Sequence, residues 1–194
     1  MKDTKRRSRC RGTVYIRPQR HMPEDQQPSV SEIYQRHGEA CDNARSKELV
    51  ESSWLDGFSA LLPAGEAVLD LGCGSGLPIA RELVRRGFDV TGVDSTLTML
   101  SLFQRNLPDT PAYLMDMRQL ALGRRFAGLL AWDSFFHLSP DEQRPMFARF
   151  QAHAAPGAAL MFTSGTEEGC VIGEPGRRSA IPWQPELSRV SSLT

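Results

Sequence analysis

The residues best suited to binding chemistry lie in one short segment, Asp70-Leu71-Gly72-Cys73-Gly74-Ser75-Gly76. Its three glycines stand at every second position, directly after an apolar run that has the length of a β-strand. Glycine adopts positive φ angles at no steric cost and lets a ligand approach bare backbone amides. One glycine would suit an ordinary tight turn, whereas three at this place favour a ligand-binding loop.

Two aspartates extend the same expected pocket. Asp94 stands at the end of the next apolar run, 22 residues after Gly72, and from there a carboxylate can accept hydrogen bonds from both hydroxyls of a ribose. Asp116 ends a third, weaker run, from which it can reach the exocyclic amine of an adenine. Together with the glycines they predict an adenosine pocket, although each aspartate alone would also suit a loop or a helix cap.

These residues need a framework that brings strand ends to one edge of a sheet. Apolar runs at 67–71, 89–93, 112–115, 126–132 and 158–163 predict five strands. Helical patterns at 78–86 and 96–106, and from Ser139 onward, separate them, and two more helices are expected before the first strand, at 30–37 and 45–62. This alternation is typical of a parallel sheet built from βα units, in which ligands bind at the carboxyl ends of the strands.

The composition describes one folded domain. The chain has 194 residues, 24% charged and 40% apolar, which excludes a collagen, a coiled coil and a wholly disordered chain. No apolar run approaches the roughly 18 to 20 residues of a membrane span. No secretory signal is evident, so we expect a cytoplasmic protein, although an Arg-rich organelle leader stays open on composition. The cysteines, Cys10, Cys41, Cys73 and Cys170, have neither C-x-x-C spacing nor partner histidines, which disfavours a zinc site and a disulfide framework.

The net charge of zero is the sum of two unlike parts. Residues 1–20 contain eight Lys or Arg and one Asp, so the remaining residues carry −7. We expect residues 1–28 to form a mobile basic tail, 29–170 to form the domain, and 171–194 to form an irregular tail that contains no strand.

The glycine spacing distinguishes between nucleotide-binding families. A G-x-G-x-x-G loop would need glycine where Leu77 stands, which disfavours a nicotinamide enzyme. The segment VLDLGCGSG instead resembles the first motif of the class I S-adenosylmethionine-dependent methyltransferases. The resemblance continues through VTGVDST, YLMDMRQL, LLAWDSFFHL and APGAALMFTSG, and so covers about residues 65–165. It implies a Rossmann-like, doubly wound α/β fold with strand order 3-2-1-4-5.

The resemblance also implies the cofactor and its contacts. S-adenosylmethionine would bind and leave as S-adenosylhomocysteine, with Asp94 at the ribose and Asp116 at the adenine amine. The residues implied to bind it are Asp70, Gly72, Cys73, Gly74, Gly76, Asp94, Ser95, Met99, Asp116, Met117 and Trp132. The two methionines would equally suit the core.

Methyl transfer from a sulfonium mainly requires that the two reactants be aligned and water be excluded. A general base contributes where the acceptor is protonated. The segment after the fourth strand offers His137 as that base and Asp133 as a second candidate, and a histidine packed at a helix start is the alternative for His137. The aromatic rings of Trp54, Phe135 and Phe136 could wall an acceptor pocket or belong to the core, and for Trp54 the core is favoured.

The same segment indicates the class of acceptor. Enzymes that methylate base amines usually carry an Asn- or Asp-Pro-Pro-aromatic loop here, and WDSFF has neither proline. A small-molecule acceptor is therefore the leading hypothesis. An RNA methyltransferase that uses the basic arm, and a protein that binds the cofactor without catalysis, are the alternatives.

The resemblance has a gap at the C-terminal end. Family members usually complete a seven-stranded sheet with an antiparallel pair of strands. The 31 residues after position 163 show no strand pattern, so we expect the last two strands to be missing. The exposed edge of the fifth strand would then favour oligomers.

Overall fold

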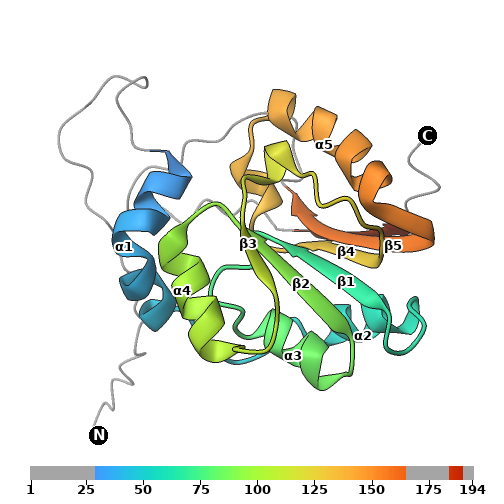
Figure 1. Cartoon of the computed structure of the whole chain (residues 1–194), viewed down its shortest axis with the longest axis horizontal. Helices are drawn as coiled ribbons and strands as arrows, with labels where there is room; N and C mark the ends of the chain where they lie inside the picture. The colour runs from blue at the N-terminus through green and yellow to red at the C-terminus, as the bar shows by residue number, and fades with distance from the viewer. Residues whose placement is uncertain (1–28, 165–183, 190–194) are drawn as a thin grey trace, which may run out of the picture.

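The computed structural model describes residues 29–164 together with the backbone of residues 184–189. Six strands form one sheet with helices on both faces, α5 on one side and α2 and α3 on the other (Figure 1). The strands are β1 (Ala67–Leu71), β2 (Asp89–Asp94), β3 (Ala112–Leu114), β4 (Phe126–Ala131), β5 (Ala154–Ser164) and β6 (Gln184–Arg189). The helices are α1 (Val30–Ala44), α2 (Ser52–Ala60), α3 (Ile79–Arg85), α4 (Leu97–Asn106) and α5 (Pro140–His153), with short 3₁₀ turns η2 (Met117–Gln119) and η3 (Phe135–His137).

The first five strands are parallel and have the order 3-2-1-4-5, so the predicted Rossmann-like α/β topology is confirmed. The central strand β1 places alternate side chains on opposite faces, as a pleated strand must. On one face Leu69 belongs to the core cluster that includes Phe150 of α5. On the other face Val68 belongs to the cluster that includes Phe58 of α2 and Leu83 of α3. The carboxyl ends of β1, β2 and β4 therefore lie at one edge, held by two cores.

The helices before the sheet differ from the prediction. α1 is longer than expected, and it begins with a capping box in which Ser29 and Glu32 bond each other's backbone. The predicted helix at 45–62 is wrong in its first part, because α2 begins only at Ser52. Arg45 has extended backbone, and its side chain is held by Asp133, 88 residues away. Periodicity cannot reveal such an ion pair, which fixes the chain in a loop.

The expectation that no strand follows β5 is wrong. β6 pairs antiparallel with β5, from Ala159 opposite Arg189 to Ser164 opposite Gln184. The pairing satisfies backbone groups along the edge of β5, so it does not need the apolar alternation that a sequence pattern detects. Pro185 is compatible with a strand that lies last in the described sheet. The edge of β5 is thus covered along this stretch, which removes the argument for oligomers through it.

The other boundaries predicted from sequence, residues 1–28 and the domain end at 170, lie outside the described residues. None of the helices in the described part of the chain has the length and apolarity to cross a bilayer.

Candidate functional site

Two cavities of about 830 and 460 Å³ lie at the carboxyl edge of the sheet. Both are within the size range of small-molecule sites. They share part of their lining, including Gly72, Gly74, Met99, Asp133 and His137. The larger cavity continues to the start of α2, and the smaller one continues along η2, so the two together form one extended site.

The glycine loop lines this site with main chain. Gly72, Gly74 and Gly76 have φ angles of +73°, +54° and +78°, as the spacing predicted. The amides of Gly72 and Cys73 donate to the carbonyl of Val93 at 2.7 and 3.0 Å, which ties the loop to β2. A Cβ atom on Gly74 would meet nothing within 4 Å. The side of Gly74 on which a side chain would stand is therefore open to a ligand.

Gly76 has a different role from Gly74. A Cβ atom on Gly76 would lie 2.9 Å from side-chain atoms of both Phe103 and Leu107. This glycine allows the loop to pack on α4.

Asp94 ends β2 and lines the smaller cavity. One carboxylate oxygen accepts from the amide of Gly74 at 3.0 Å, and the other accepts from the amide and hydroxyl of Thr96, both at 2.9 Å. Burial raises the pKa of Asp94, and these hydrogen bonds oppose the rise. The carboxylate is thereby fixed beside the glycine loop.

Ser95 is exposed and lines neither cavity, whereas Thr96 lines the smaller one. The structure therefore does not bring Ser95 into the site. Thr96 was not predicted as a site residue, although a hydroxyl two residues after an aspartate is a common partner of its carboxylate.

Asp70 lies behind the glycine loop, where it is 4% exposed and lines the larger cavity. No hydrogen bond or ion pair reaches its carboxylate from the described residues. Burial, together with the nearby charge of Asp94, raises the pKa of Asp70 to about 7. A cationic group in the cavity would stabilise the ionised form.

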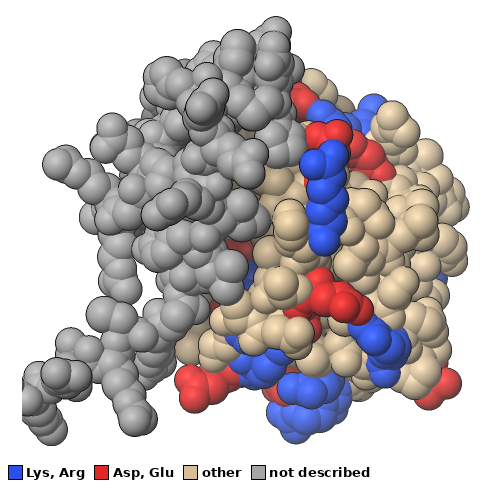
Figure 2. All heavy atoms as spheres, turned by 90° about the vertical axis from the view of Figure 1, so that its left-hand side faces the viewer, with Lys and Arg blue, Asp and Glu red and all other residues tan. Residues whose placement is uncertain are grey.

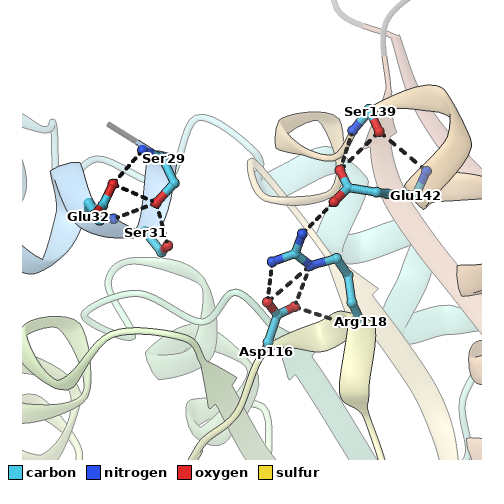
Figure 3. Close-up of polar contacts among 7 residues, drawn as sticks. All are labelled: Ser29, Ser31, Glu32, Asp116, Arg118, Ser139 and Glu142. Atoms are coloured by element: carbon cyan, nitrogen blue, oxygen red, sulfur yellow. Dashed lines mark hydrogen bonds and ion pairs between the residues drawn. The ribbon is translucent and has the colours of Figure 1, made fainter. Parts of the chain in front are cut away.

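Asp116 lines the smaller cavity but already has a partner. Arg118 bonds both of its carboxylate oxygens, with Nε at 3.0 Å from each and Nη2 at 2.5 Å from one. Arg118 also bonds Glu142, which caps α5 together with Ser139 (Figure 3). The guanidinium lowers the pKa of Asp116. An adenine amine at Asp116 would therefore share the carboxylate with Arg118, a residue that sequence reasoning missed.

The sulfur-containing residues and Trp132 divide between core and cavity. Met99 is 6% exposed yet lines both cavities, Met117 lines the smaller and Trp132 the larger. Burial raises the pKa of the Cys73 thiol well above its ordinary value, which disfavours the reactive thiolate. Cys41 and Cys73 are both free thiols. No group of three metal-ligating side chains occurs among the residues that the structure describes.

The chain makes a tight turn after β4 and carries His137 into the site. Asp133 has a φ of +50°, its amide donates to the Thr163 hydroxyl at 2.9 Å, and its carboxylate pairs with Arg45. His137 lines both cavities, with the Tyr34 ring centroid 6.2 Å from its own. His137 is partly exposed, yet partial desolvation lowers its pKa, as does Arg45, whereas Asp133 raises it. Because the net shift is downward from 6.5, the ring is neutral at pH 7 and able to accept a proton.

The aromatic residues proposed for the acceptor pocket, Trp54, Phe135 and Phe136, differ in whether they line a cavity or belong to the core. Phe135 is 1% exposed and belongs to the core, whereas Phe136 lines the larger cavity. Trp54 is 41% exposed and also lines that cavity, so the favoured core assignment is wrong. It lies in the first turn of α2, where Leu55 and Phe58 turn toward the sheet and leave the Trp54 ring at the cavity.

The N-terminal segment lies over this edge of the sheet. α1 packs beside α4 (Figure 1), where Gln35 bonds both Thr98 and the amide of Leu97. At the other end of α1, Asp42 accepts from Ser75 of the glycine loop. These contacts hold α1 against both α4 and the glycine loop.

Comparison with known proteins gives a family match and two curated relatives of one kind. Residues 68–157 match the family model described as a methyltransferase domain. The chain is 31% identical over 126 residues to dTDP-3-amino-3,6-dideoxy-alpha-D-glucopyranose N,N-dimethyltransferase of Streptomyces fradiae, covering 64% of this chain and 42% of that protein. It is 27% identical to a dTDP-3-amino-3,4,6-trideoxy-alpha-D-glucopyranose N,N-dimethyltransferase of Streptomyces venezuelae, covering 61% and 54%. The chain thus spans about half the length of these relatives.

A solved structure is also similar to this chain. It is an amino pentose methyltransferase of Micromonospora echinaspora with bound S-adenosylmethionine, with a TM-score of 0.55, 27% identity and coverage of 66% of this chain and 54% of that one.

Proposed function

Because residues 68–157 form a methyltransferase domain of the class I S-adenosylmethionine-dependent family, we propose that this protein transfers a methyl group from S-adenosylmethionine to an amine of a small molecule. The observation that carries the proposal is that His137 lines both cavities of the extended site, as does Asp133. The two curated relatives are N,N-dimethyltransferases of amino sugars, which supports an amine as the acceptor class.

The residues at the glycine loop fit the donor. Asp70 presents a buried carboxylate that has no described partner, suited to the donor's ammonium. Gly74 leaves its backbone open, and Asp94 is fixed beside it for the ribose hydroxyls. Met99, Met117 and Asp116 line the smaller cavity, where the adenine would lie. When bound, S-adenosylmethionine supplies a methyl group that is activated by its sulfonium.

The chain's own contribution to the reaction is alignment and proton removal. An amine at neutral pH arrives as an ammonium, which has no lone pair with which to attack. His137 accepts the proton, and the Asp133 carboxylate stabilises the resulting imidazolium. With S-adenosylmethionine bound, the freed nitrogen would form a bond to the methyl carbon as the carbon–sulfur bond breaks, which would leave a thioether and an N-methylated product. α1 and the walls of the larger cavity hold the two reactants in line and exclude water.

The described surface favours a small acceptor over a nucleic acid. Basic and acidic side chains are interspersed over the described residues of the face seen in Figure 2. The charged residues that line the larger cavity are mainly carboxylates, which do not attract a polyanion. The RNA hypothesis depends on residues 1–20, which lie outside the described part. The cytoplasmic location stays a prediction.

Calorimetry with S-adenosylmethionine and S-adenosylhomocysteine tests the proposal. Micromolar binding of both is expected, and Asp94→Ala should abolish it. Asp89→Ala is the matched control, because Asp89 lies at the opposite end of β2 and is exposed. Absence of binding to either compound would overturn the assignment.

A further inference from the structure

We propose that the acceptor is a cationic amine without a phosphate group and that Glu51, with Trp54, recognises its charge. The inference rests on the proposed function and names the acceptor class more narrowly.

The larger cavity has an excess of negative charge. Among the described residues its charged lining consists of Asp42, Glu48, Glu51, Asp70, Asp133 and Arg45. Asp42 is neutralised by Lys47, and Asp133 by Arg45. The other three carboxylates have no ion pair within the described part of the chain. Asp70 lies at the glycine loop, on the donor side, so Glu48 and Glu51 set the charge of the remaining space.

Of Glu48 and Glu51, Glu51 is the better candidate for binding a cation. Its Oε2 atom is buried and has no hydrogen-bond partner among the described residues. Its main chain is fixed at the start of α2, because its carbonyl accepts from the amides of Trp54 and Leu55, both at 3.0 Å. A buried carboxylate oxygen without a donor is costly. A ligand ammonium would supply the missing donor and the counter-charge together.

Trp54 adds a second element suited to a cation. It follows Glu51 by three residues, a spacing that puts the two side chains on one face of the helix start. Its ring is 41% exposed and lines the same cavity. A carboxylate beside an exposed indole is a favourable environment for an ammonium. Trp132 and His137 line this cavity too, which places the cation on the side where we propose methyl transfer.

The negative charge of the larger cavity does not suit the diphosphate-bearing substrates that the names of the curated relatives give. By their names, those enzymes act on amino sugars that are linked to dTDP and therefore carry a diphosphate. A diphosphate in the larger cavity would face uncompensated carboxylates, and the only guanidinium among its described lining residues is already paired with Asp133. We therefore expect selection against the nucleotide-linked form.

The test compares one amine in two forms. The full chain, saturated with S-adenosylhomocysteine, is titrated calorimetrically with free 3-amino-3,6-dideoxyglucose and with the dTDP conjugate of the same sugar. The free amine should bind at least tenfold more tightly. Equal or tighter binding of the conjugate, or no binding of the free amine, would overturn the inference.

Variants identify the recognising residues. Glu51→Gln should weaken binding of the free amine about tenfold and raise KM more than it lowers kcat, with S-adenosylhomocysteine affinity unchanged. Glu51→Asp should restore part of the loss, and Trp54→Leu should weaken the amine independently of Glu51. Glu66→Gln is the matched control, since Glu66 is exposed and lines neither cavity. Unchanged amine affinity in Glu51→Gln would contradict the role of Glu51.

The outcomes also separate the two proposals. If S-adenosylhomocysteine does not bind, the proposed function fails and this inference fails with it. If S-adenosylhomocysteine binds while the dTDP conjugate is preferred, only the charge selection is overturned and the methyltransferase proposal stands.

Discussion

A Cβ atom placed on Gly72 would lie 2.3 Å from the Cβ of Ser134 and 2.9 Å from its hydroxyl oxygen. The two residues follow β1 and β4, and the Ser134 hydroxyl donates to the carbonyl of Leu71 at 2.7 Å. The strand ends that carry the donor loop and the candidate base are thus in direct contact. Their relative position depends on the absence of a side chain at residue 72.

Replacement of the loop glycines should therefore have unequal effects. Gly72→Ala combines a φ of +73° with a clash against a buried serine, so we expect a loss of about 2 to 4 kcal/mol in the free energy of unfolding. Gly74→Ala meets no atom within 4 Å and should lose only about 1 to 2 kcal/mol, from backbone strain. Chemical denaturation measures both values.

Donor binding should rank the two glycine variants differently from stability. The methyl group of Gly74→Ala points into open space beside the loop, so its donor affinity should fall although the fold persists. Equal destabilisation by the two substitutions would contradict the contact between Gly72 and Ser134.

Asp70 should make the fold less stable as the pH rises. Its pKa is raised from 3.8 to about 7, so the native state keeps a proton that the unfolded chain has already lost. The stabilisation is complete below about pH 4 and is lost as the pH rises toward 7, at about 1.4 kcal/mol per pKa unit. Asp70→Asn should flatten this dependence and be the more stable protein above pH 7.

Denaturant midpoints measured from pH 4 to 8 check this prediction, with Asp89→Asn as an exposed control on β2. An Asp70→Asn variant whose stability still falls over that range by the wild-type amount would contradict burial of the charge. Asp94, whose pKa is also raised, contributes a change of the same sign.

The Arg45–Asp133 pair should tune His137 more than it stabilises the fold. The two side chains are 50% and 33% exposed, and such pairs contribute at most about 1 kcal/mol. Arg45 lowers the pKa of His137, so Arg45→Ala should raise it, as seen in an NMR titration of the imidazole ring. Arg105→Ala breaks another exposed pair, with Glu39 of α1, and should leave the His137 titration unchanged. A downward shift in Arg45→Ala would refute this coupling.

The parallel sheet could be predicted because its determinants are local. The apolar runs, the glycines after β1 and the aspartates at strand ends all follow from what one strand–loop–helix unit requires. Trp54, Arg118 and β6 could not be predicted, because neither apolar periodicity nor a turn motif specifies their positions. Arg118 forms hydrogen bonds with Asp116 and Glu142, and β6 pairs with the backbone groups along the edge of β5. Periodicity assigned Trp54 to the core because it records only that the residue is apolar, whereas its place at the helix start leaves it at the cavity.

His137 should control kcat without affecting donor binding. If it removes the acceptor proton, His137→Gln should lower kcat about 100- to 10,000-fold and leave S-adenosylhomocysteine affinity unchanged. The activity of the unmodified protein should fall as the pH drops through the pKa of His137, which lies below 6.5, and this limb should disappear in the variant. Steady-state rates from pH 5 to 8 measure both effects.

His153→Gln is the control for His137→Gln, because His153 is a histidine that only packs within the fold. His153 is buried on α5, accepts from the amide of Leu122 at 3.1 Å and lies 2.9 Å from the carbonyl oxygen of Arg149. Its replacement should lower stability by about 1 to 3 kcal/mol, since the half-buried amide of Leu122 and carbonyl of Arg149 lose their hydrogen bonds, while the pH profile keeps its acidic limb. If His137→Gln instead loses stability in this way and keeps both kcat and the acidic limb, His137 is a packing residue and the proton must leave by another route.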